Sequence, residues 1–263
     1  MAFYSIAYTY YDLLLKISSA GIPFAIAALV SRYYAKEDYK TVLLVKKLGI
    51  SIVMGLTFIV AIVFGLLSPS LARQSMGSSA SVTDIENLKI IFSILLLAVI
   101  LVPYLSAIRG YYQGLKRLDL YGSSQALEQF VRVFCIIFFG FLLTRVFALE
   151  SIYAIYAAIG AAGVAAFVTI IFFMFFTKED DQRIDELVKG QTSKAVSKKI
   201  LVVEIISLSV PYLLISFLGS LSALVNSTFF MDTVTKAGVL SVEQAKLEMG
   251  ILLANCNKLS SIP

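Results

Sequence analysis

Two short stripes of polar side chains interrupt long apolar stretches of this chain, and they are its strongest candidates for chemistry. One stripe combines an ion pair with hydroxyl groups at steps of four, four and three residues: Tyr8, Asp12, Lys16 and Ser19. The other combines two amides with an ion pair at i, i+3, i+4 and i+7: Gln125, Glu128, Gln129 and Arg132. Both spacings place the side chains on one face of an α-helix. A polar face on an otherwise apolar helix must meet a wet cavity or a polar partner helix.

Each ionisable group in the middle of a membrane helix costs roughly 2.5–3.5 kcal/mol on insertion scales, so each needs a physical reason. Within each stripe the acid and the base are four residues apart, and they can be structural pairs that neutralise each other. For Arg132 this interpretation and cavity lining both stay open, because Glu128 lies one turn from the end of its predicted span and Arg132 can snorkel. Lys16 lies near the middle of its span, which favours a cavity. We predict a substrate-binding set of six residues: Lys16, Asp12, Arg132, Glu128, Gln125 and Gln129.

Enzyme chemistry has one candidate, the cluster Asp180-Asp181-x-x-x-Asp185, which is similar to the aspartate clusters that bind magnesium diphosphate in prenyl transferases. No second cluster accompanies it in the sequence. Its neighbours favour a simpler explanation, two i,i+4 ion pairs: Glu179–Arg183 and Asp185–Lys189. This pattern predicts a short interfacial helix that ends at Gly190.

The other common chemical motifs are absent from the sequence. It contains no P-loop, no nucleophile elbow and no zinc-binding spacing. There is no histidine, and the two cysteines, Cys135 and Cys256, lie in apolar runs, so neither a disulfide framework nor a metal site is indicated. We predict no catalytic residue, no metal and no cofactor, and therefore a protein that is not an enzyme.

The elements that must position the two stripes are membrane helices. Apolar residues make up 59% of the 263, charged residues 15%, and the mean hydropathy is +0.87. A single globular core cannot bury that much apolar surface, because soluble domains are about 45–50% apolar. Long apolar runs predict an all-α polytopic bundle of six spans and part of a seventh. The spans cover residues 4–31, 43–67, 88–108, 124–147, 152–176 and 200–230, and the partial one starts near 243.

The basic residues predict the direction of the spans. The six loops contain 5, 2, 3, 1, 6 and 2 Lys and Arg residues, if Arg109 is counted in the third loop. By the positive-inside rule the first, third and fifth loops are cytoplasmic. The net charge of +5 is therefore a sign of membrane topology and not of a nucleic-acid partner. The second connection, 68–83, is rich in Ser and Gly and is predicted to be an external loop.

Several residues predict how the helices bend and pack. Gly21 with Pro23 predicts a bend in the first span, and Pro211 predicts one in the sixth. The sixth span also has a weakly polar strip: Ser209, Ser216, Ser220, Ala223 and Ser227. Small residues in the fifth span predict close helix packing: Ala158, Gly160, Ala162, Gly163 and Ala166.

Three stretches carry a family resemblance: ISSAGIPFAIAALVSRYYAKEDYK (17–40), PYLSAIRGYYQGLKRLDLYGSSQALEQFVRV (103–133) and VNSTFFMDTVTKAGVLSVEQAKLEMG (225–250). The most specific part is RGYYQGL followed by a Q-x-x-EQ-x-x-RV helix. The chain resembles the flippases of the multidrug/oligosaccharidyl-lipid/polysaccharide exporter superfamily, in the branch of stage V sporulation protein B and the lipid II flippases. It departs from that family in having RLDLYGSS where a Pro-Thr-Ala run is usual.

The resemblance implies a fold of about fourteen helices in two lobes of six around a central cavity, plus extra helices. On that template the chain lacks helix one, supplies helices two to seven and stops in helix eight. Residues 1–176 then belong to the N-terminal lobe, 177–199 form a cytoplasmic amphipathic linker, and 200–263 begin the second lobe. The remainder of such a transporter is then an expected partner.

The resemblance also implies a function. It is the movement of an undecaprenyl-diphosphate-linked, lipid II-like precursor across the bacterial cytoplasmic membrane by alternating access, with basic cavity residues on the diphosphate. Arg132 carries over with its motif, and Lys16 matches a cationic position of relatives loosely. A drug/cation antiporter of the same superfamily, an inactive fragment and a membrane enzyme of the polyprenyl pathway are the alternatives.

Overall fold

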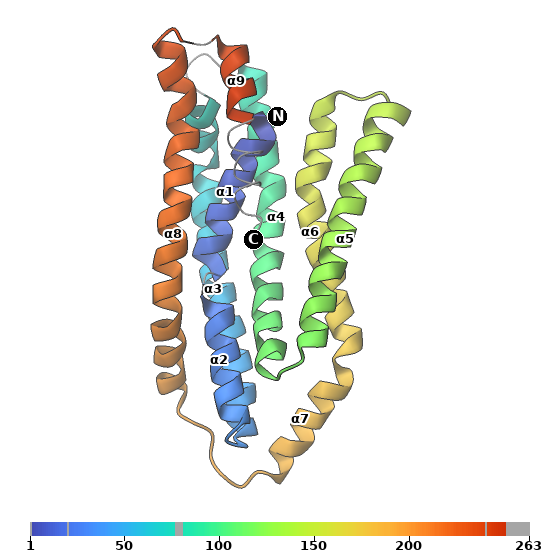
Figure 1. The fold of residues 1–263 in the computed structure, drawn as a ribbon, viewed down its shortest axis with the longest axis vertical. Helices are drawn as coiled ribbons and strands as arrows, with labels where there is room; N and C mark the ends of the chain where they lie inside the picture. The colour runs from blue at the N-terminus through green and yellow to red at the C-terminus, as the bar shows by residue number, and fades with distance from the viewer. Residues whose placement is uncertain (1, 20, 77–80, 240, 251–263) are drawn as a thin grey trace.

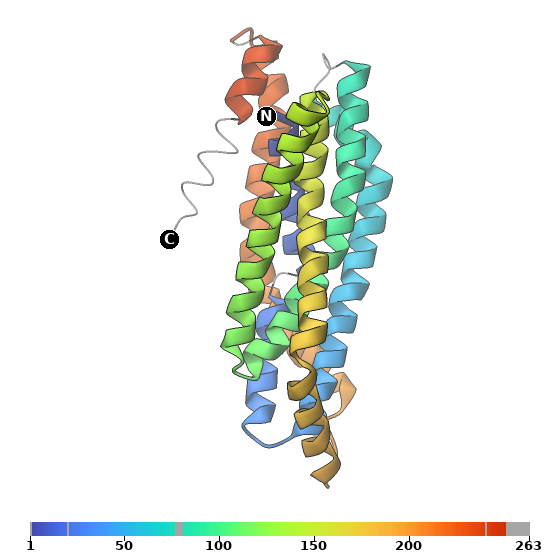
Figure 2. The same cartoon turned by 90° about the vertical axis from the view of Figure 1, so that its right-hand side faces the viewer.

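The computed structural model describes residues 2–19, 21–76, 81–239 and 241–250, and within them it is a bundle of helices without strands. The long helices run side by side along one axis (Figures 1 and 2). Their bounds are α1 Ala2–Ser19, α2 Ile22–Tyr34, α3 Tyr39–Met76, α4 Val82–Gly114, α5 Leu118–Phe141 with a π-helical extension Leu142–Val146, α6 Ser151–Phe176, α7 Lys178–Gly190, α8 Lys198–Lys236 and α9 Val242–Gly250. The predicted all-α class is confirmed.

Five helical segments of the described residues are long and apolar enough to cross a membrane. They are Phe3–Tyr34, Tyr39–Met76, Val82–Gly114, Leu118–Val146 and Ser151–Phe176. They coincide with the first five predicted spans. The sixth predicted span, 200–230, lies inside the 39-residue helix α8. Of the seventh, the structure describes only the short helix α9, and residues 251–263 lie outside the described part.

The helices extend further than the apolar runs. Helix α3 has 38 residues, about 57 Å at 1.5 Å per residue, against a hydrocarbon layer of about 30 Å. The predicted external loop 68–83 is wrong for most of its length, because α3 continues to Met76 and α4 begins at Val82. Packing explains the difference: Ala72 and Met76 are buried, and the Ser75 hydroxyl is 2.9 Å from that of Tyr10 in α1.

The first span is broken where Gly21 predicts a bend. Gly21 has a φ of +79° and separates α1 from α2, with a proline in the first turn of α2. A Cβ atom on Gly21 would lie 2.5 Å from the backbone oxygen of Ser209 in α8, so the position also needs glycine for close packing. Pro211 lies inside α8 without ending the helix. Of the polar strip on α8, Ser209 is buried, and the side chains of Ser216, Ser220, Ala223 and Ser227 lie outside the described part.

The connections fall at two opposite ends of the bundle. The α2–α3 and α4–α5 connections lie at one end together with α7, at the bottom of Figure 1, and the α5–α6 and α8–α9 connections lie at the other. The three most basic loops therefore share one end, as the alternation of charges requires. Which end faces the cytoplasm stays a prediction. One count was wrong: Arg109 lies inside α4 and is buried.

Two apolar cores hold the bundle together. One joins α2, α3, α4, α6 and α8 near the basic end, around Leu29, Val45 and Tyr111. The other joins α1, α3, α4 and α6 near the opposite end, around Tyr10, Phe92 and Leu95. Helix α6 packs on α4, and a Cβ atom on Gly160 or Gly163 would come within ordinary van der Waals distance of α4 side chains. Helix α5 packs mainly on α6 and lies at the outer edge of the bundle in Figure 1.

Candidate functional site

Two polar cavities lie between α1, α4 and α5, and the six predicted site residues line them. One cavity, of about 370 Å³, is bordered by five of the six: Asp12, Gln125, Glu128, Gln129 and Arg132. The other, of about 310 Å³, is bordered by Lys16 and Gln125. Leu15, Arg109 and Gln125 line both, so the two cavities adjoin. The polar faces of α1 and α5 thus meet across a common space, although a role in binding stays a prediction.

The α1 side contributes a compact ion pair. Lys16 Nζ donates to Asp12 Oδ2 at 2.8 Å, and each side chain is 38% exposed. Ser19 donates its hydroxyl to the Leu15 carbonyl one turn back. The i,i+4 pair predicted as a structural alternative is therefore present, and both of its members also border the cavities. Asp12 and Lys16 can therefore form a structural pair and line the cavities at the same time.

The α5 side contributes a carboxylate shared by two arginines. Arg109 Nη1 donates to Glu128 Oε2 at 2.7 Å, and Arg132 Nη2 donates to the other oxygen, Oε1. The side chains of Arg109, Glu128 and Arg132 are 10%, 7% and 24% exposed. A buried carboxylate with a guanidinium on each oxygen is far less costly than a lone buried charge.

Arg109 is the residue that the sequence interpretation missed. Its Nε donates to Ser124 Oγ at 2.9 Å and its Nη2 to the Ser124 carbonyl at 2.8 Å, so α4 is fastened to α5 beside Glu128. The predicted third span ended at residue 108, and Arg109 was placed in the loop for that reason. Its apolar and aromatic neighbours, in the stretch LSAIRGYY, were the available signal that the helix continues.

Glu128 lies further from the start of its helix than from the start of its predicted span. Helix α5 begins at Leu118 and not near 124, so Glu128 lies ten residues into the helix, about 15 Å along its axis. The guanidinium of Arg132, one turn further along α5, donates to Glu128, and the pair lies between the helices.

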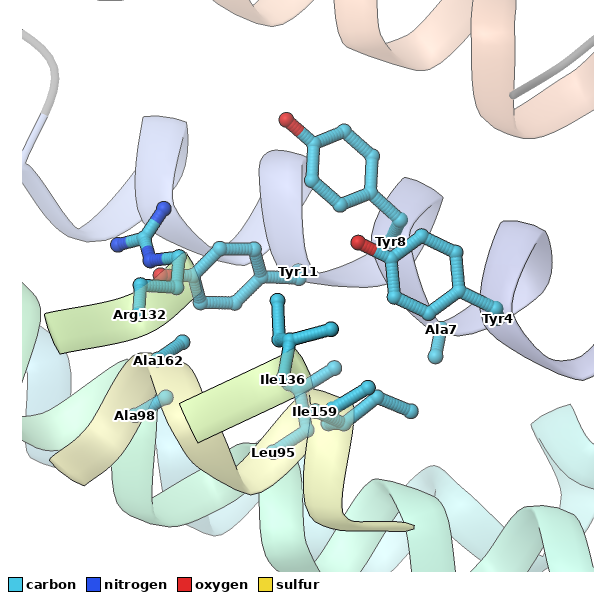
Figure 3. Close-up of a pocket in the computed structure, with 11 residues that line it drawn as sticks. Tyr4, Ala7, Tyr8, Tyr11, Leu95, Ala98, Arg132, Ile136, Ile159 and Ala162 are labelled. Carbon is cyan, nitrogen blue, oxygen red and sulfur yellow. The ribbon is translucent and has the colours of Figure 1, made fainter. Parts of the chain in front are cut away.

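A smaller apolar cavity of about 60 Å³ continues from the charged one. Figure 3 shows Arg132 and Tyr11 at one end of it, and Tyr4, Ile136 and Ile159 toward the other. The hydroxyl of Tyr11 and the Nε of Arg132 are buried and have no hydrogen-bond partner within the described part of the chain. The arrangement therefore offers cationic groups beside an apolar surface, which suits a molecule that joins an anion to a hydrocarbon chain.

The aspartates of α7 form a second ionic group, at the basic end of the bundle. Asp181 accepts hydrogen bonds from Lys46 Nζ at 2.8 Å and from the Tyr112 hydroxyl at 3.0 Å, while Asp180 pairs with Arg117. Lys46 Nζ also lies 4.4 Å from the centre of the Tyr111 ring. We call Lys46, Tyr112, Arg117, Asp180 and Asp181 the end cluster.

The end cluster changes the explanation of the aspartate motif. The predicted short helix is confirmed as α7, with Ile184 buried. The sequence interpretation paired Glu179 with Arg183 and Asp185 with Lys189, but among the described residues no salt bridge joins either pair. Asp180 and Asp181 instead bind Arg117 in the α4–α5 connection and Lys46 in α3. Among the described residues, no group of three or more His, Cys, Asp or Glu side chains is placed to hold a metal ion.

The resemblance noted in the sequence is supported by a comparison with protein families. The profile of the family described as "Polysaccharide biosynthesis protein" matches residues 1–256. The chain belongs to this family. The match covers nearly the whole chain and confirms the resemblance to the exporter superfamily. With five helical segments long enough to span a bilayer, this family member is a multi-pass cell membrane protein.

A curated relative supports the same branch of the family. Over 147 residues the chain is 31% identical to the lipid II flippase MurJ of Bacillus subtilis (strain 168). The alignment covers 56% of this chain and 27% of that protein, so the matched part is about a quarter of the relative's length. No solved structure matches the chain.

Proposed function

We propose that this chain takes part in moving a polyprenyl-diphosphate-linked precursor of the cell wall or of a polysaccharide across the membrane, by alternating access. The observation that carries the proposal is the pair of adjoining polar cavities inside an otherwise apolar bundle. The family and the name of the B. subtilis relative support a lipid-linked substrate. In this proposal Lys16, Arg132 and their polar neighbours contact the substrate and no catalytic step occurs.

The charge of the cavities suits an anionic ligand. The charged residues among the described lining are three cations, Lys16, Arg109 and Arg132, and two carboxylates, Asp12 and Glu128, which leaves 3 − 2 = +1. Charge-assisted hydrogen bonds from Arg and Lys to phosphate oxygens are strong and directional. The apolar cavity beside Arg132 adds room for hydrocarbon. A diphosphate that carries a lipid chain fits both features.

The same contacts disfavour the alternatives. An antiporter for drugs or cations needs carboxylates that can exchange a cation for a proton or a sodium ion. Here Asp12 accepts from Lys16, and Glu128 accepts from two arginines. A polyprenyl-pathway enzyme needs an acidic cluster at the membrane surface, and two of the three aspartates in the cluster of α7 are paired, Asp181 with Lys46 and Asp180 with Arg117.

Rescue of a bacterial strain depleted of its lipid II flippase, and of other members of the superfamily, tests the proposal. The 263-residue chain is expressed alone and, in parallel, joined to the complementary part of the B. subtilis relative. We expect the joined protein to restore growth and to move labelled lipid-linked precursor to the outer leaflet, whereas the chain alone does not. An inserted, folded joined protein that never moves the precursor would contradict the proposal.

A further inference from the structure

Glu128 lies between two guanidinium groups in the way that a bound phosphate would. Each of its oxygens accepts from a different arginine, one on α4 and one on α5. We propose that the Glu128 carboxylate is an internal stand-in for the ligand's anion, which gives up Arg132 to the ligand while it keeps Arg109. The proposal rests on the proposed function only for the lipid-linked nature of the anion.

Arg109 is the arginine that stays. All three of its nitrogens have partners: Nε and Nη2 donate to Ser124, and Nη1 donates to Glu128. Ser124 is itself fully buried and its hydroxyl donates to the Tyr121 carbonyl. Because these contacts fix the guanidinium plane against the backbone of α5, Arg109 cannot turn toward a ligand without losing several hydrogen bonds at once.

Arg132 is the arginine that can leave. Glu128 is its partner in the described structure, and its Nε is buried without a hydrogen-bond acceptor. The side chain also borders both the charged cavity and the apolar one. A buried donor without an acceptor is a cost that a ligand oxygen would remove. Arg132 is therefore the group with unused capacity at the place where a ligand would enter.

Arg109 keeps Glu128 paired when Arg132 turns to a ligand. Removing one partner from a buried pair leaves an uncompensated charge, which is strongly unfavourable. When Arg132 turns to a ligand, Glu128 still has Arg109 at 2.7 Å. The other charged residue that lines this cavity, Asp12, is already paired with Lys16, which lines the adjoining cavity. Arg109 therefore permits Arg132 to change partners without leaving Glu128 as a lone buried charge.

Binding measurements on the detergent-solubilised chain test the exchange, with inorganic pyrophosphate and undecaprenyl diphosphate as probes. The change Glu128→Gln removes the competing charge and keeps the shape, so we expect affinity for pyrophosphate to rise roughly tenfold, as the loss of one charge-assisted competitor implies. An affinity that is unchanged or lower in a folded Glu128→Gln protein would overturn the proposal. If that variant does not fold, Glu128→Asp keeps the charge beside Arg109 but shortens the reach to Arg132, and a smaller gain is expected.

A double-mutant cycle with Arg109→Gln separates exchange from a general effect of charge. Without Arg109, Glu128 holds Arg132 more firmly, so affinity should fall several-fold although Arg109 does not contact the ligand. In the Glu128→Gln background the same change should have little effect. Equal losses of affinity in both backgrounds would mean that Arg109 acts only through its positive charge, and would overturn the proposal. Thermal unfolding of each variant checks that it is folded.

The lipid probe distinguishes this inference from the proposed function. A higher affinity of Glu128→Gln for both probes supports both the exchange of partners and a lipid-linked ligand. A gain with pyrophosphate, while no variant binds undecaprenyl diphosphate, supports the exchange and contradicts the proposed substrate. If wild type and Glu128→Gln bind both probes with equal affinity, the inference is overturned and the proposed function still stands.

Discussion

The bundle contains two groups of ion pairs, one beside the cavities and one in the end cluster, and they differ in what surrounds them. The shared carboxylate of Glu128 lies beside two cavities, and one of its arginines has a buried nitrogen without an acceptor. In the end cluster, Asp181 accepts from both Lys46 and Tyr112, and Lys46 also lies over an aromatic ring. Each of the five residues of the end cluster has a hydrogen-bond or ion-pair partner, whereas Arg132 beside the cavities has a buried nitrogen without an acceptor among the described residues.

This difference suggests different roles for the two groups. At the end of the bundle, pairs between α7 and the α3–α4 region fasten a linker helix to its support, and partly exposed pairs of this kind contribute modestly to stability. Inside the bundle each charge is costly, so a charge without a full set of partners needs another explanation. We expect changes in the cavity to affect binding and transport, and changes in the end cluster to affect stability.

The largest effect is expected at Lys16, on the cavity side. In the joined protein that restores transport, Lys16→Ala should abolish transport and leave membrane insertion intact, because one charge-assisted contact is worth about 10–100-fold in affinity. Lys16→Arg should retain part of the activity, since the charge stays and the geometry changes. Transport is measured as movement of labelled lipid-linked precursor.

The control for Lys16 is the removal of the whole pair. A structural pair can be removed together at little cost, so Asp12→Asn with Lys16→Gln should restore near-normal transport if Lys16 only neutralises Asp12. We expect that double variant to stay inactive. Near-normal transport would mean that Lys16 has a structural role like the end cluster, and that the cavity residues and the end cluster do not differ in role.

The next effect concerns the rigid wall of the cavity. Gly110 borders the cavity, and a Cβ atom there would lie 2.5 Å from the backbone oxygen of Pro23 in α2. Gly110→Ala should therefore push α4 from α2 and lower the free energy of unfolding by about 1–3 kcal/mol. Gly122→Ala is the matched control, since nothing lies within 4 Å of its Cβ position. Thermal unfolding in detergent compares them, and equal stability of the two variants would argue against a tightly packed wall.

A smaller effect is expected in the end cluster. Asp181→Ala removes the acceptor of Lys46 and Tyr112, and should lower the free energy of unfolding by about 1–2 kcal/mol. Pyrophosphate affinity should not change, because Asp181 is not among the residues that line the cavities. Glu186→Ala, at an exposed position of the same helix, is the control. A large change in affinity for Asp181→Ala would show that the two regions are coupled.

The smallest effect is a dependence on pH at the start of α3. Burial alone would raise the pKa of Asp38, but hydrogen bonds from Thr41 and Gln191 outweigh burial and the pKa is lowered. A lowered pKa contributes stability above the ordinary value of about 4, and that contribution is lost as the pH falls through the folded-state value.

Wild type should therefore be more stable than Asp38→Asn at about pH 7, by less than about 1 kcal/mol for a partly exposed group, and the difference should shrink as the pH falls below the ordinary pKa of about 4. Unfolding curves at several pH values measure it. A difference that does not depend on pH would mean that the charge of Asp38 contributes nothing at this end of the bundle.

Much of the fold could be predicted because it depends on local properties. Apolar runs of about 20 residues predict spans, and the five segments that can cross a membrane match them. The ends were less predictable. The sequence SPSLARQSM reads as a loop by composition, yet it is helical because Ala72, Ser75 and Met76 pack into the core beside α1. Packing outweighed local preference there.

The candidate site also has features that local sequence predicts and features that only packing sets. The helical period alone places Asp12 with Lys16, and Glu128 with Arg132, on single faces, and the predicted pairs are present. The period cannot say which faces meet, because that depends on how α1, α4 and α5 pack. Arg109 could be recognised only when its helix was seen to continue past the apolar run.

The sequence by itself thus determined which segments are membrane helices and which of their faces are polar, since both follow from hydrophobicity and the 3.6-residue period. Only the tertiary structure decided that Arg109 shares Glu128 with Arg132, and that Lys46 meets Asp181, 135 positions further along the chain. The physical reason is that a buried charge accepts whichever partner the packing brings within hydrogen-bond distance, and packing between distant segments is not written in any local pattern.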